Sequence, residues 1–346
     1  MKGRVIVLSR LGGREAAALM VDGRLADLLI EGPEDGPPAP GAIFRGIVDR
    51  PLKGQGGVFL RLPGGARAFL REAKGLSPGQ PLLVQVTGYS EPGKAVPVTA
   101  RLLFKSRYAI VTPDAPGLNL SRRIRDEAVR TRLGKAAETA MTGSQMGLIL
   151  RSAAELGAAD EIADEIAAMR ELAERVTSDA GGEPEHLLEG PGPHHLAWRD
   201  WAEPPPDEVA EGPDAFEDHG VLDAIDALRS AEVPLGAGSG MWVEPTRALV
   251  AVDVNTGSDT TPAASLKANL AAARELPRQL RLRGLGGQIA IDFAPVPKHD
   301  RRAVEGALKA AFKADQVETA LVGWTPLGHY EAQRKRERLP LAEALE

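Results

Sequence analysis

Cysteine is absent from the 346-residue sequence, which excludes disulfide bonds, cysteine-ligated zinc and a thiol nucleophile. Long apolar runs are absent too. The first run, from Val5 to Leu8, is interrupted at Arg10, far short of a signal-peptide core. No stretch approaches the roughly twenty apolar residues that a membrane span needs. We therefore expect a cytoplasmic protein that does not enter the membrane.

Charge is distributed unevenly along the chain. The net charge is −6, which argues against a polyanionic partner because such partners favour a positive field. The segment from Glu155 to Glu232, however, carries 22 acidic and 4 basic residues, and the rest of the chain carries 26 acidic and 38 basic residues, a net charge of +12. One acidic segment therefore masks a basic protein, and we interpret that segment as a solvated surface.

The N-terminal region has the pattern of short strands. The chain is longer than one hydrophobic core usually organises, so we expect two or more globular units. Apolar residues alternate on both sides of Asp22-Gly23, a pair that predicts a β-hairpin. After a break rich in proline and glycine, further short strands have the spacing of a small barrel. These expected barrel strands cover residues 43–48, 57–62, 66–70, 81–87 and 96–103.

Helical periodicity begins after the expected barrel. Apolar residues recur at helical spacing between Asp160 and Val176, whereas residues 184–213 are rich in proline, glycine and acid and are expected to form a loop, some of it mobile. The last third alternates between helices and strands, which predicts a layered α/β unit with ligands at the strand ends. Its expected elements are helices over 216–228, 264–283 and 301–312 and strands over 241–244, 248–254, 288–293 and 318–322.

Two apolar runs in this last third each end in a carboxylate. One run ends at Asp253, with Asn255 two residues later, and the other ends at Asp292. If the two strands are neighbours, about 4.8 Å apart, the carboxylates meet at one edge of the sheet. Two such anions repel each other unless a cation lies between them, and Mg²⁺ suits because it takes few protein oxygens and completes its shell with water and phosphate. The alternative is that each aspartate caps a following turn or helix.

The same stretch is similar to the catalytic core of the ribonuclease E/G family. The resemblance implies that Asp253 and Asp292 hold a Mg²⁺ ion and that Asn255 helps to orient the scissile group. The motifs that carry it are ALVAVDVNTG at 248–257, Asn269-Leu270, RQLRLRGLGG at 278–287 and Ile291-Asp292-Phe293.

Weaker matches extend over nearly the whole chain. Phe59 and Phe69 match the paired aromatic residues on the family's OB-fold RNA-binding barrel, and Lys94 matches a basic residue of that surface. Independently of the resemblance, aromatic faces stack on unpaired bases with about 1–3 kcal/mol each, and lysine neutralises phosphate. The alternative for a phenylalanine in a strand is packing in the core.

The motif GLILRS at residues 147–152 is similar to the family's pocket for the 5′-monophosphate of RNA. The resemblance implies that Arg151 and Ser152 bind the phosphate. Ser152 stands where the family commonly has threonine, so a hydroxyl group is kept.

Two basic stretches also match the family. Arg122 and Arg123 match a stretch near the 5′-phosphate pocket and are expected to bind RNA, and Arg334 matches one in the catalytic domain and is expected to bind the 5′-phosphate. Arginine makes bidentate phosphate contacts that lysine does not. The alternative for such basic runs is a solvated face.

The resemblance implies a multidomain α/β (α+β) fold. An RNase H-like scaffold is interrupted by the OB-fold barrel and a 5′-phosphate sensor, and a DNase I-like catalytic domain follows. The expected domains are 1–37 (first RNase H-like segment), 38–105 (barrel), 106–187 (sensor), 188–215 (a reduced second RNase H-like segment, or a loop) and 216–346 (catalytic domain).

The resemblance also bears on assembly. The long members of the ribonuclease E/G family carry a cysteine pair that shares zinc across a dimer, and a small dimerisation domain. With neither present, no zinc-linked tetramer is expected, only a monomer or weak dimer.

The sequence thus predicts a Mg²⁺-dependent endoribonuclease that cleaves single-stranded RNA to 5′-phosphate and 3′-hydroxyl products, in RNA processing or decay. The metal would activate a water molecule for in-line attack. One alternative is a non-catalytic RNA-binding module that retains the fold. Another is a metal-dependent phosphodiesterase that acts on DNA or small nucleotides. No general base is evident, and His299, although near the site in sequence, is not assigned a role.

Overall fold

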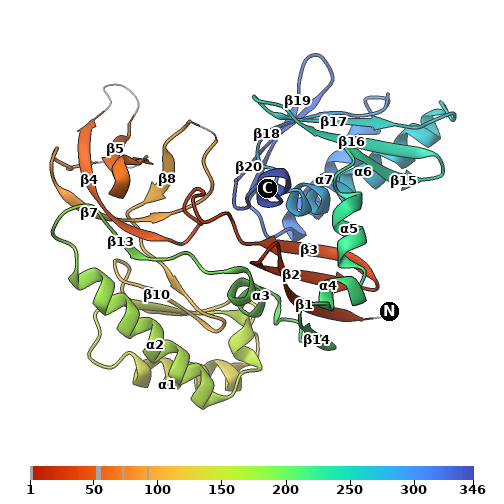
Figure 1. The fold of residues 1–346 in the computed structure, drawn as a ribbon. Helices are drawn as coiled ribbons and strands as arrows, with labels where there is room; N and C mark the ends of the chain where they lie inside the picture. Colours follow the sequence, from red (N-terminus) through yellow and green to blue (C-terminus); the bar gives the residue numbers. More distant parts are fainter. Residues whose placement is uncertain (1–2, 52–55, 72–73, 92) are drawn as a thin grey trace. The chain divides into compact units, whose positions relative to one another are not determined.

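The computed structural model describes residues 3–51, 56–71, 74–91 and 93–346, and the chain forms two compact units (Figure 1). The first unit combines residues 1–34 with residues 207–346, and the second consists of residues 35–206. The second unit is therefore an insertion in the sequence of the first. Among the helices of the described ranges, none is long and apolar enough to cross a membrane.

A four-stranded sheet begins the first unit. Asp22 and Gly23, with φ of 50° and 77°, form the turn between its second and third strands, so the predicted hairpin is confirmed. The helix expected over residues 216–228 is instead two short helices, because Gly220 adopts a φ of 67° between them. The sheet order is β14-β1-β2-β3, with β1 (Arg4–Leu11), β2 (Arg14–Val21), β3 (Arg24–Ile30) and β14 (Glu208–Glu211), and the helices are α4 (Ala215–Asp218), α5 (Val221–Ala227) and α8 (Leu341–Ala344).

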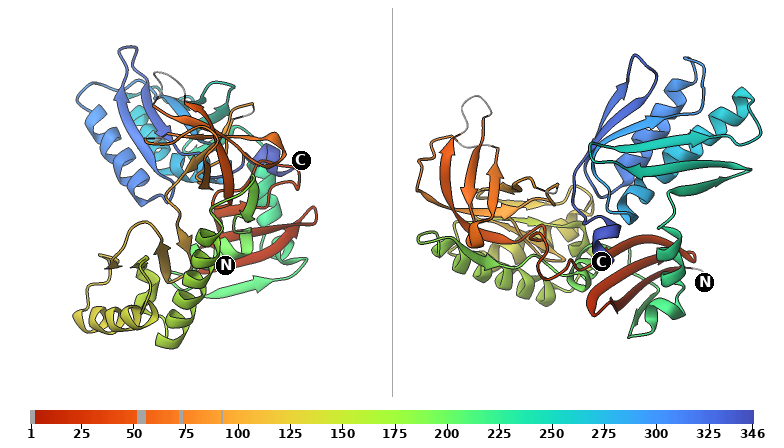
Figure 2. Two further views of the ribbon diagram at one scale, coloured as in Figure 1. Left: turned by 90° about the vertical axis from the view of Figure 1, so that its left-hand side faces the viewer. Right: turned by 45° about the horizontal axis from the view of Figure 1, so that its top comes forward.

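The second sheet of the first unit has six strands, and two long helices cover one of its faces (Figure 2). Leu276 and Leu308 from these helices share a buried core with Val252 and Ile291 from the central strands. Side chains alternate along a strand, so the residues between the buried ones lie on the open face. The order is β15-β16-β17-β18-β20-β19, with β15 (Glu232–Gly236), β16 (Ser239–Pro245), β17 (Val250–Asn255), β18 (Gly287–Asp292), β19 (Thr319–Trp324) and β20 (Tyr330–Arg334), and the helices are α6 (Pro262–Leu282) and α7 (Arg301–Ala314). The layered α/β arrangement predicted for this region is confirmed.

A closed five-stranded barrel begins the second unit. Its first strand pairs with both the second and the fourth, and its third pairs in parallel with the fifth, which closes the sheet on itself. Val58, Leu60, Val84 and Val98 point into its core. The predicted barrel is therefore confirmed. Its strands are β4 (Ile43–Pro51), β5 (Val58–Arg61), β6 (Arg67–Leu70), β7 (Pro81–Val86) and β8 (Val96–Thr99), with η1 (Pro63–Gly65) between β5 and β6.

A second layer of the same unit combines a four-stranded sheet with two α-helices and one short 3₁₀-helix. Ile43 and Leu83 of the barrel share its buried core with residues such as Leu148 and Ile162, so the barrel and this layer pack as one body. The sheet order is β11-β12-β10-β9, with β9 (Phe104–Lys105), β10 (Ala109–Thr112), β11 (Leu118–Leu120) and β12 (Gly147–Leu150), and the helices are α1 (Glu127–Ala140), η2 (Ser152–Glu155) and α2 (Ala159–Ser178).

Residues 184–213 contain three regular elements, so the prediction of a loop over this segment is wrong. Strand β13 (Glu185–Leu188) pairs with β4, and β14 pairs in parallel with β1. Helix α3 (Pro193–Trp201) begins with a proline, which is tolerated in the first turn because its missing N–H has no partner there, and it buries Ala197 and Trp201. Long-range strand pairing and one helix stabilise a segment whose composition is typical of a loop.

Candidate active site

Asp253 and Asp292 are direct cross-strand partners. They lie at the same level of the neighbouring parallel strands β17 and β18. Adjacent strands are about 4.8 Å apart, so the two carboxylates share one small region of the sheet. The expectation that the two apolar strands are neighbours is therefore confirmed.

Strand alternation places both carboxylates on the open face. Val252, Val254 and Ile291 point into the core under α6 and α7, so Asp253 and Asp292 point the other way. The Asp292 side chain is 63% exposed. An ion or a phosphate group can therefore reach the pair from solvent.

Asn255 lies on the same face, at the end of β17, where the chain turns sharply. Its Oδ1 atom accepts a hydrogen bond of 2.8 Å from the N–H of Gly257, so it stabilises the turn. Gly257 has a φ of 69°, and a Cβ atom there would collide with the carbonyl oxygen of Gly238. The turn thus fixes the carbonyl of the Asn255 amide and leaves the NH₂ group for a ligand beside the carboxylates.

The electrostatics of the pair favour a bound cation. Partial burial, followed by the negative charges of Asp292 and Glu244, raises the pKa of Asp253 above its ordinary value. Asp253 is therefore harder to ionise with Asp292 beside it. A divalent cation between them would relieve this repulsion.

The donor set fits a small, hard cation. Within the part of the chain that the structure describes, no group of three or more histidine, aspartate or glutamate residues could hold a metal ion. The two carboxylates of Asp253 and Asp292 are oxygen donors, and Mg²⁺ is commonly bound by one or two carboxylates while it keeps several waters. The residues present therefore fit Mg²⁺ better than a metal that needs a full set of protein ligands.

His329 is a neighbour of the site that the sequence did not reveal. Its Nε2 atom lies 3.9 Å from Oδ2 of Asp292, and it immediately precedes β20, which pairs with β18. His299, near the site in sequence, is 80% exposed and lies 3.5 Å from Asp300 instead. Strand pairing, rather than sequence distance, decides which histidine reaches the carboxylates.

Phe59 and Phe69 form a pair on the outside of the barrel. They are cross-strand partners on β5 and β6, and their ring centroids are 5.4 Å apart. Both are half-buried, whereas Val58 and Leu60 on either side of Phe59 are buried in the barrel core. The guanidinium of Arg67 lies 4.2 Å from the centre of the Phe59 ring. The pair therefore lies on the outer face of the barrel rather than in its core.

The predicted RNA-binding cations are exposed. Lys94 lies in the loop between β7 and β8 and pairs with Glu91. Arg122 and Arg123 are exposed in the turn after β11, and the side chain of Arg130 braces this turn through the carbonyls of Ser121 and Ile124. All three cations can be reached from solvent.

Arg151 and Ser152, the residues of the expected 5′-phosphate pocket, are already bonded to carboxylates. The Arg151 guanidinium donates to Asp200 (2.8 Å) and to the carbonyl of Ser106 (2.7 Å), and the Ser152 hydroxyl donates to Glu203 (3.0 Å). Burial alone would raise the pKa of Asp200, but hydrogen bonds from Arg199 and Arg151 lower it, so the carboxylate stays ionised. A phosphate would have to displace both carboxylates.

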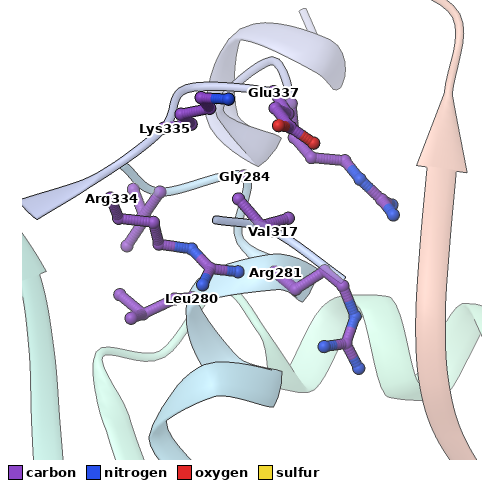
Figure 3. Close-up of a pocket in the computed structure, with 9 residues that line it drawn as sticks. Leu280, Arg281, Gly284, Val317, Arg334, Lys335 and Glu337 are labelled. Atoms are coloured by element: carbon purple, nitrogen blue, oxygen red, sulfur yellow. The ribbon is translucent and has the colours of Figure 1, made fainter. Parts of the chain in front are cut away.

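Arg334 is buried, which disagrees with its expected role in phosphate binding. Its side chain and that of Asp315 are each 1% exposed and form an ion pair of 2.7 Å, and its guanidinium also donates to Thr319. It points into the small pocket of Figure 3. We therefore interpret Arg334 as a residue that stabilises the fold. The pocket is lined by Leu280, Arg281, Gly284, Leu285, Val317, Arg334, Lys335, Glu337 and Arg338.

The chain is similar to known ribonucleases. The profile of the Ribonuclease E/G family matches residues 104–212 and 206–337. The chain is 29% identical to Ribonuclease G of Salmonella typhimurium (strain SL1344), over 75% of this chain and 60% of that protein, and 29% identical to Ribonuclease G of Escherichia coli (strain K12), over 77% and 62%. It is 28% identical to Ribonuclease E of Nostoc sp. (strain PCC 7120 / SAG 25.82 / UTEX 2576), over 76% and 44%. The chain therefore spans between 44% and 62% of the length of these relatives.

Proposed function

The chain belongs to the ribonuclease E/G family, and on this premise we propose that it is a Mg²⁺-dependent endoribonuclease that cleaves single-stranded RNA. The relatives are named ribonucleases, and the products we propose are a 5′-phosphate and a 3′-hydroxyl end. The observation that carries the proposal is the direct pairing of Asp253 with Asp292 on the open face of the sheet. RNA processing or decay in the cytoplasm is the role that we propose for it.

Asp253 and Asp292 are the residues that would hold the metal. Mg²⁺ bound there would act as a Lewis acid toward the scissile phosphate and toward the attacking water. The carboxylates would bind and position the cation, and relief of the repulsion between them would favour its binding. Asn255, whose carbonyl is held by the N–H of Gly257, can direct its NH₂ group at a phosphate oxygen and so orient the scissile group.

The barrel supplies the proposed binding surface for RNA. Phe59 and Phe69 present their rings outside the barrel core, where unpaired bases can stack on them. Lys94, Arg122 and Arg123 are exposed cations on the same unit and can neutralise phosphates. The stacking pair favours single-stranded over double-stranded substrates because paired bases do not offer their faces.

We also propose the family's domain layout for this chain. Residues 1–37 and 188–215 would form the two segments of an RNase H-like scaffold, residues 38–105 an OB-fold barrel, residues 106–187 the sensor region, and residues 216–346 a DNase I-like catalytic domain. The closed barrel within residues 43–99 and the pairing of β14 with β1 support this layout. A monomer or weak dimer is the proposed assembly.

A non-catalytic RNA-binding module is the alternative. It would need the fold and the barrel surface but not the paired carboxylates, so the conjunction of Asp253, Asn255 and Asp292 on one open face argues against it. A phosphodiesterase for DNA or small nucleotides is a second alternative. Incubation of the protein with single-stranded RNA or with DNA of the same sequence, each in the presence of Mg²⁺, distinguishes the three functions. Cleavage of RNA alone supports the proposal, and binding without cleavage overturns it.

A further inference from the structure

Trp242 lies directly opposite Asp253 on the antiparallel strand β16. Its neighbours Met241 and Val243 are buried in the core beneath the helices, so Trp242 faces the open side of the sheet together with the carboxylates. Directly opposed residues on antiparallel strands have Cβ atoms about 4.5–5.5 Å apart. The indole is therefore within contact range of Asp253.

The indole also extends toward Asn255. A Cβ atom placed on Gly240 would lie 3.6 Å from Cζ3 and 3.6 Å from Cη2 of the Trp242 ring, so the six-membered ring lies over Gly240. Gly240 is the cross-strand partner of Asn255. The ring therefore occupies the surface that a side chain on Gly240 would take, and it borders both Asp253 and Asn255.

The surroundings of the ring disfavour phosphate. Glu232 is the partner of Trp242 on the outer strand β15, and Glu244 follows two residues later on β16 on the same face. These carboxylates repel a phosphodiester but not a neutral nucleobase. A base is therefore the portion of an RNA strand that this side of the site can accept.

Resting on the proposed function, we propose that Trp242 stacks on the nucleobase next to the phosphodiester that would lie at the proposed Mg²⁺ site of Asp253 and Asp292. The half-buried indole lies outside the core of the sheet, on the same face as the carboxylates. Stacking of a base on an aromatic side chain is tolerant of sequence, because every base has a flat face. Trp242 thereby positions the RNA strand at the scissile bond and acts as a positioning residue rather than as a catalytic one.

The test combines a protein change with an RNA change. Cleavage rates are measured on an RNA oligonucleotide with one cleavage site, and on two versions in which the nucleotide on one or the other side of the scissile phosphate is abasic. Trp242→Leu keeps an apolar side chain but removes the aromatic face, whereas Trp242→Phe keeps a smaller aromatic face. Thermal melting shows that each variant is folded.

For the wild type, we expect removal of one of the two flanking bases to slow cleavage by about tenfold, the size of a single stacking contact. Trp242→Leu should cleave intact RNA about tenfold more slowly than the wild type, through a higher KM. Its rate should not fall further on the abasic RNA that slows the wild type. Trp242→Phe should recover most of the rate. Trp198→Ala, which removes a 51% exposed tryptophan from the other unit, should behave as wild type.

Three results would overturn the inference, and only the last of them also overturns the proposed function. In the first, the cleavage rate of Trp242→Leu falls from intact to abasic RNA by the same factor as that of the wild type. In the second, Trp242→Leu cleaves intact RNA at the wild-type rate. In either case Trp242 does not stack, and the ribonuclease proposal stands. If the wild type does not cleave intact RNA, the proposed function fails and this inference fails with it.

Discussion

The carboxylates of Asp253 and Asp292 project from the same level of two parallel neighbouring strands, and the negative charge of Asp292 contributes to the raised pKa of Asp253. This arrangement disfavours the ionised form of Asp253 when no cation is present, because two anions are brought together at one level of the sheet. The proposed Mg²⁺ site would therefore link the folding stability of the first unit to the concentration of the cation, with measurable consequences apart from catalysis.

Removal of one carboxylate should stabilise the metal-free protein. We expect Asp253→Asn to raise the melting temperature in EDTA, since it removes the repulsion from Asp292 and Glu244 while it keeps the shape of the side chain. For wild type, Mg²⁺ should raise the melting temperature as its concentration increases, because a ligand that binds only the folded state stabilises it. The variant should lose most of this response. A Mg²⁺ response equal in both proteins would place the cation elsewhere.

The pH dependence of this effect has a definite sign. The pKa of Asp253 is raised in the folded state, so this group favours folding at low pH and disfavours it once pH rises through the folded pKa. The stabilisation by Asp253→Asn in EDTA should therefore be larger at neutral pH than at acidic pH, where the wild-type carboxyl is protonated. Thermal melts across this range measure it.

Loss of the aromatic pair should weaken RNA binding without unfolding the barrel. Phe59→Ala and Phe69→Ala should each lower the affinity for single-stranded RNA by about 1–3 kcal/mol, because each removes a stacking surface. Leu60→Ala is the contrasting variant. Leu60 is fully buried, so its truncation should lower the free energy of unfolding by about 2–5 kcal/mol. Fluorescence anisotropy and denaturant melts separate the two effects. A similar loss of stability in the phenylalanine variants would show that they are core residues.

A 5′-phosphate should give the wild type little advantage. Arg151 and Ser152 donate to Asp200 and Glu203, so a phosphate must displace two carboxylates before it gains the same hydrogen bonds. We expect similar cleavage rates on 5′-phosphorylated and 5′-hydroxyl RNA. Asp200→Asn removes the charge that competes for Arg151 and should create a preference of several fold for the phosphorylated end.

The control for this experiment is Glu189→Gln, which changes an exposed acid in the same segment, with a side chain that is 85% exposed. It should leave the ratio of the two rates unchanged. A strong preference for 5′-phosphorylated RNA in the wild type, lost in Arg151→Ala, would show that the carboxylates yield to phosphate and that the pocket functions.

Much of the fold followed from local patterns in the sequence. The turn at Asp22-Gly23 needs positive φ at both positions, and the pair Asp-Gly indicates this directly. The apolar runs before Asp253 and Asp292 indicate buried strands, and the helix between them indicates a crossover that places the strands in parallel. The pairing of the two carboxylates could therefore be predicted.

Long-range contacts account for what the sequence did not reveal. His329 reaches Asp292 only because β20 pairs with β18, and Trp242 reaches Asp253 only because β16 pairs with β17 in one particular register. Arg334 lies in a basic run that has the pattern of an exposed surface, yet its place on β20 turns it inward to Asp315. The residues next to His329, Trp242 and Arg334 in the sequence do not indicate which aspartate each side chain approaches.

Cleavage of single-stranded RNA by wild type, Asp253→Asn and Asp292→Asn in Mg²⁺ tests most directly whether the paired carboxylates form the active site. The matched control is Asp259→Asn, since Asp259 lies four residues beyond Asn255 and accepts a hydrogen bond from the N–H of Thr261, as a turn-capping aspartate does. RNA binding is followed by anisotropy in the same samples. We predict that both site variants lose at least about a hundredfold in rate while they still bind RNA, and that Asp259→Asn and wild type cleave alike. Wild-type cleavage that persists unchanged in both Asp253→Asn and Asp292→Asn would contradict an active site at these residues.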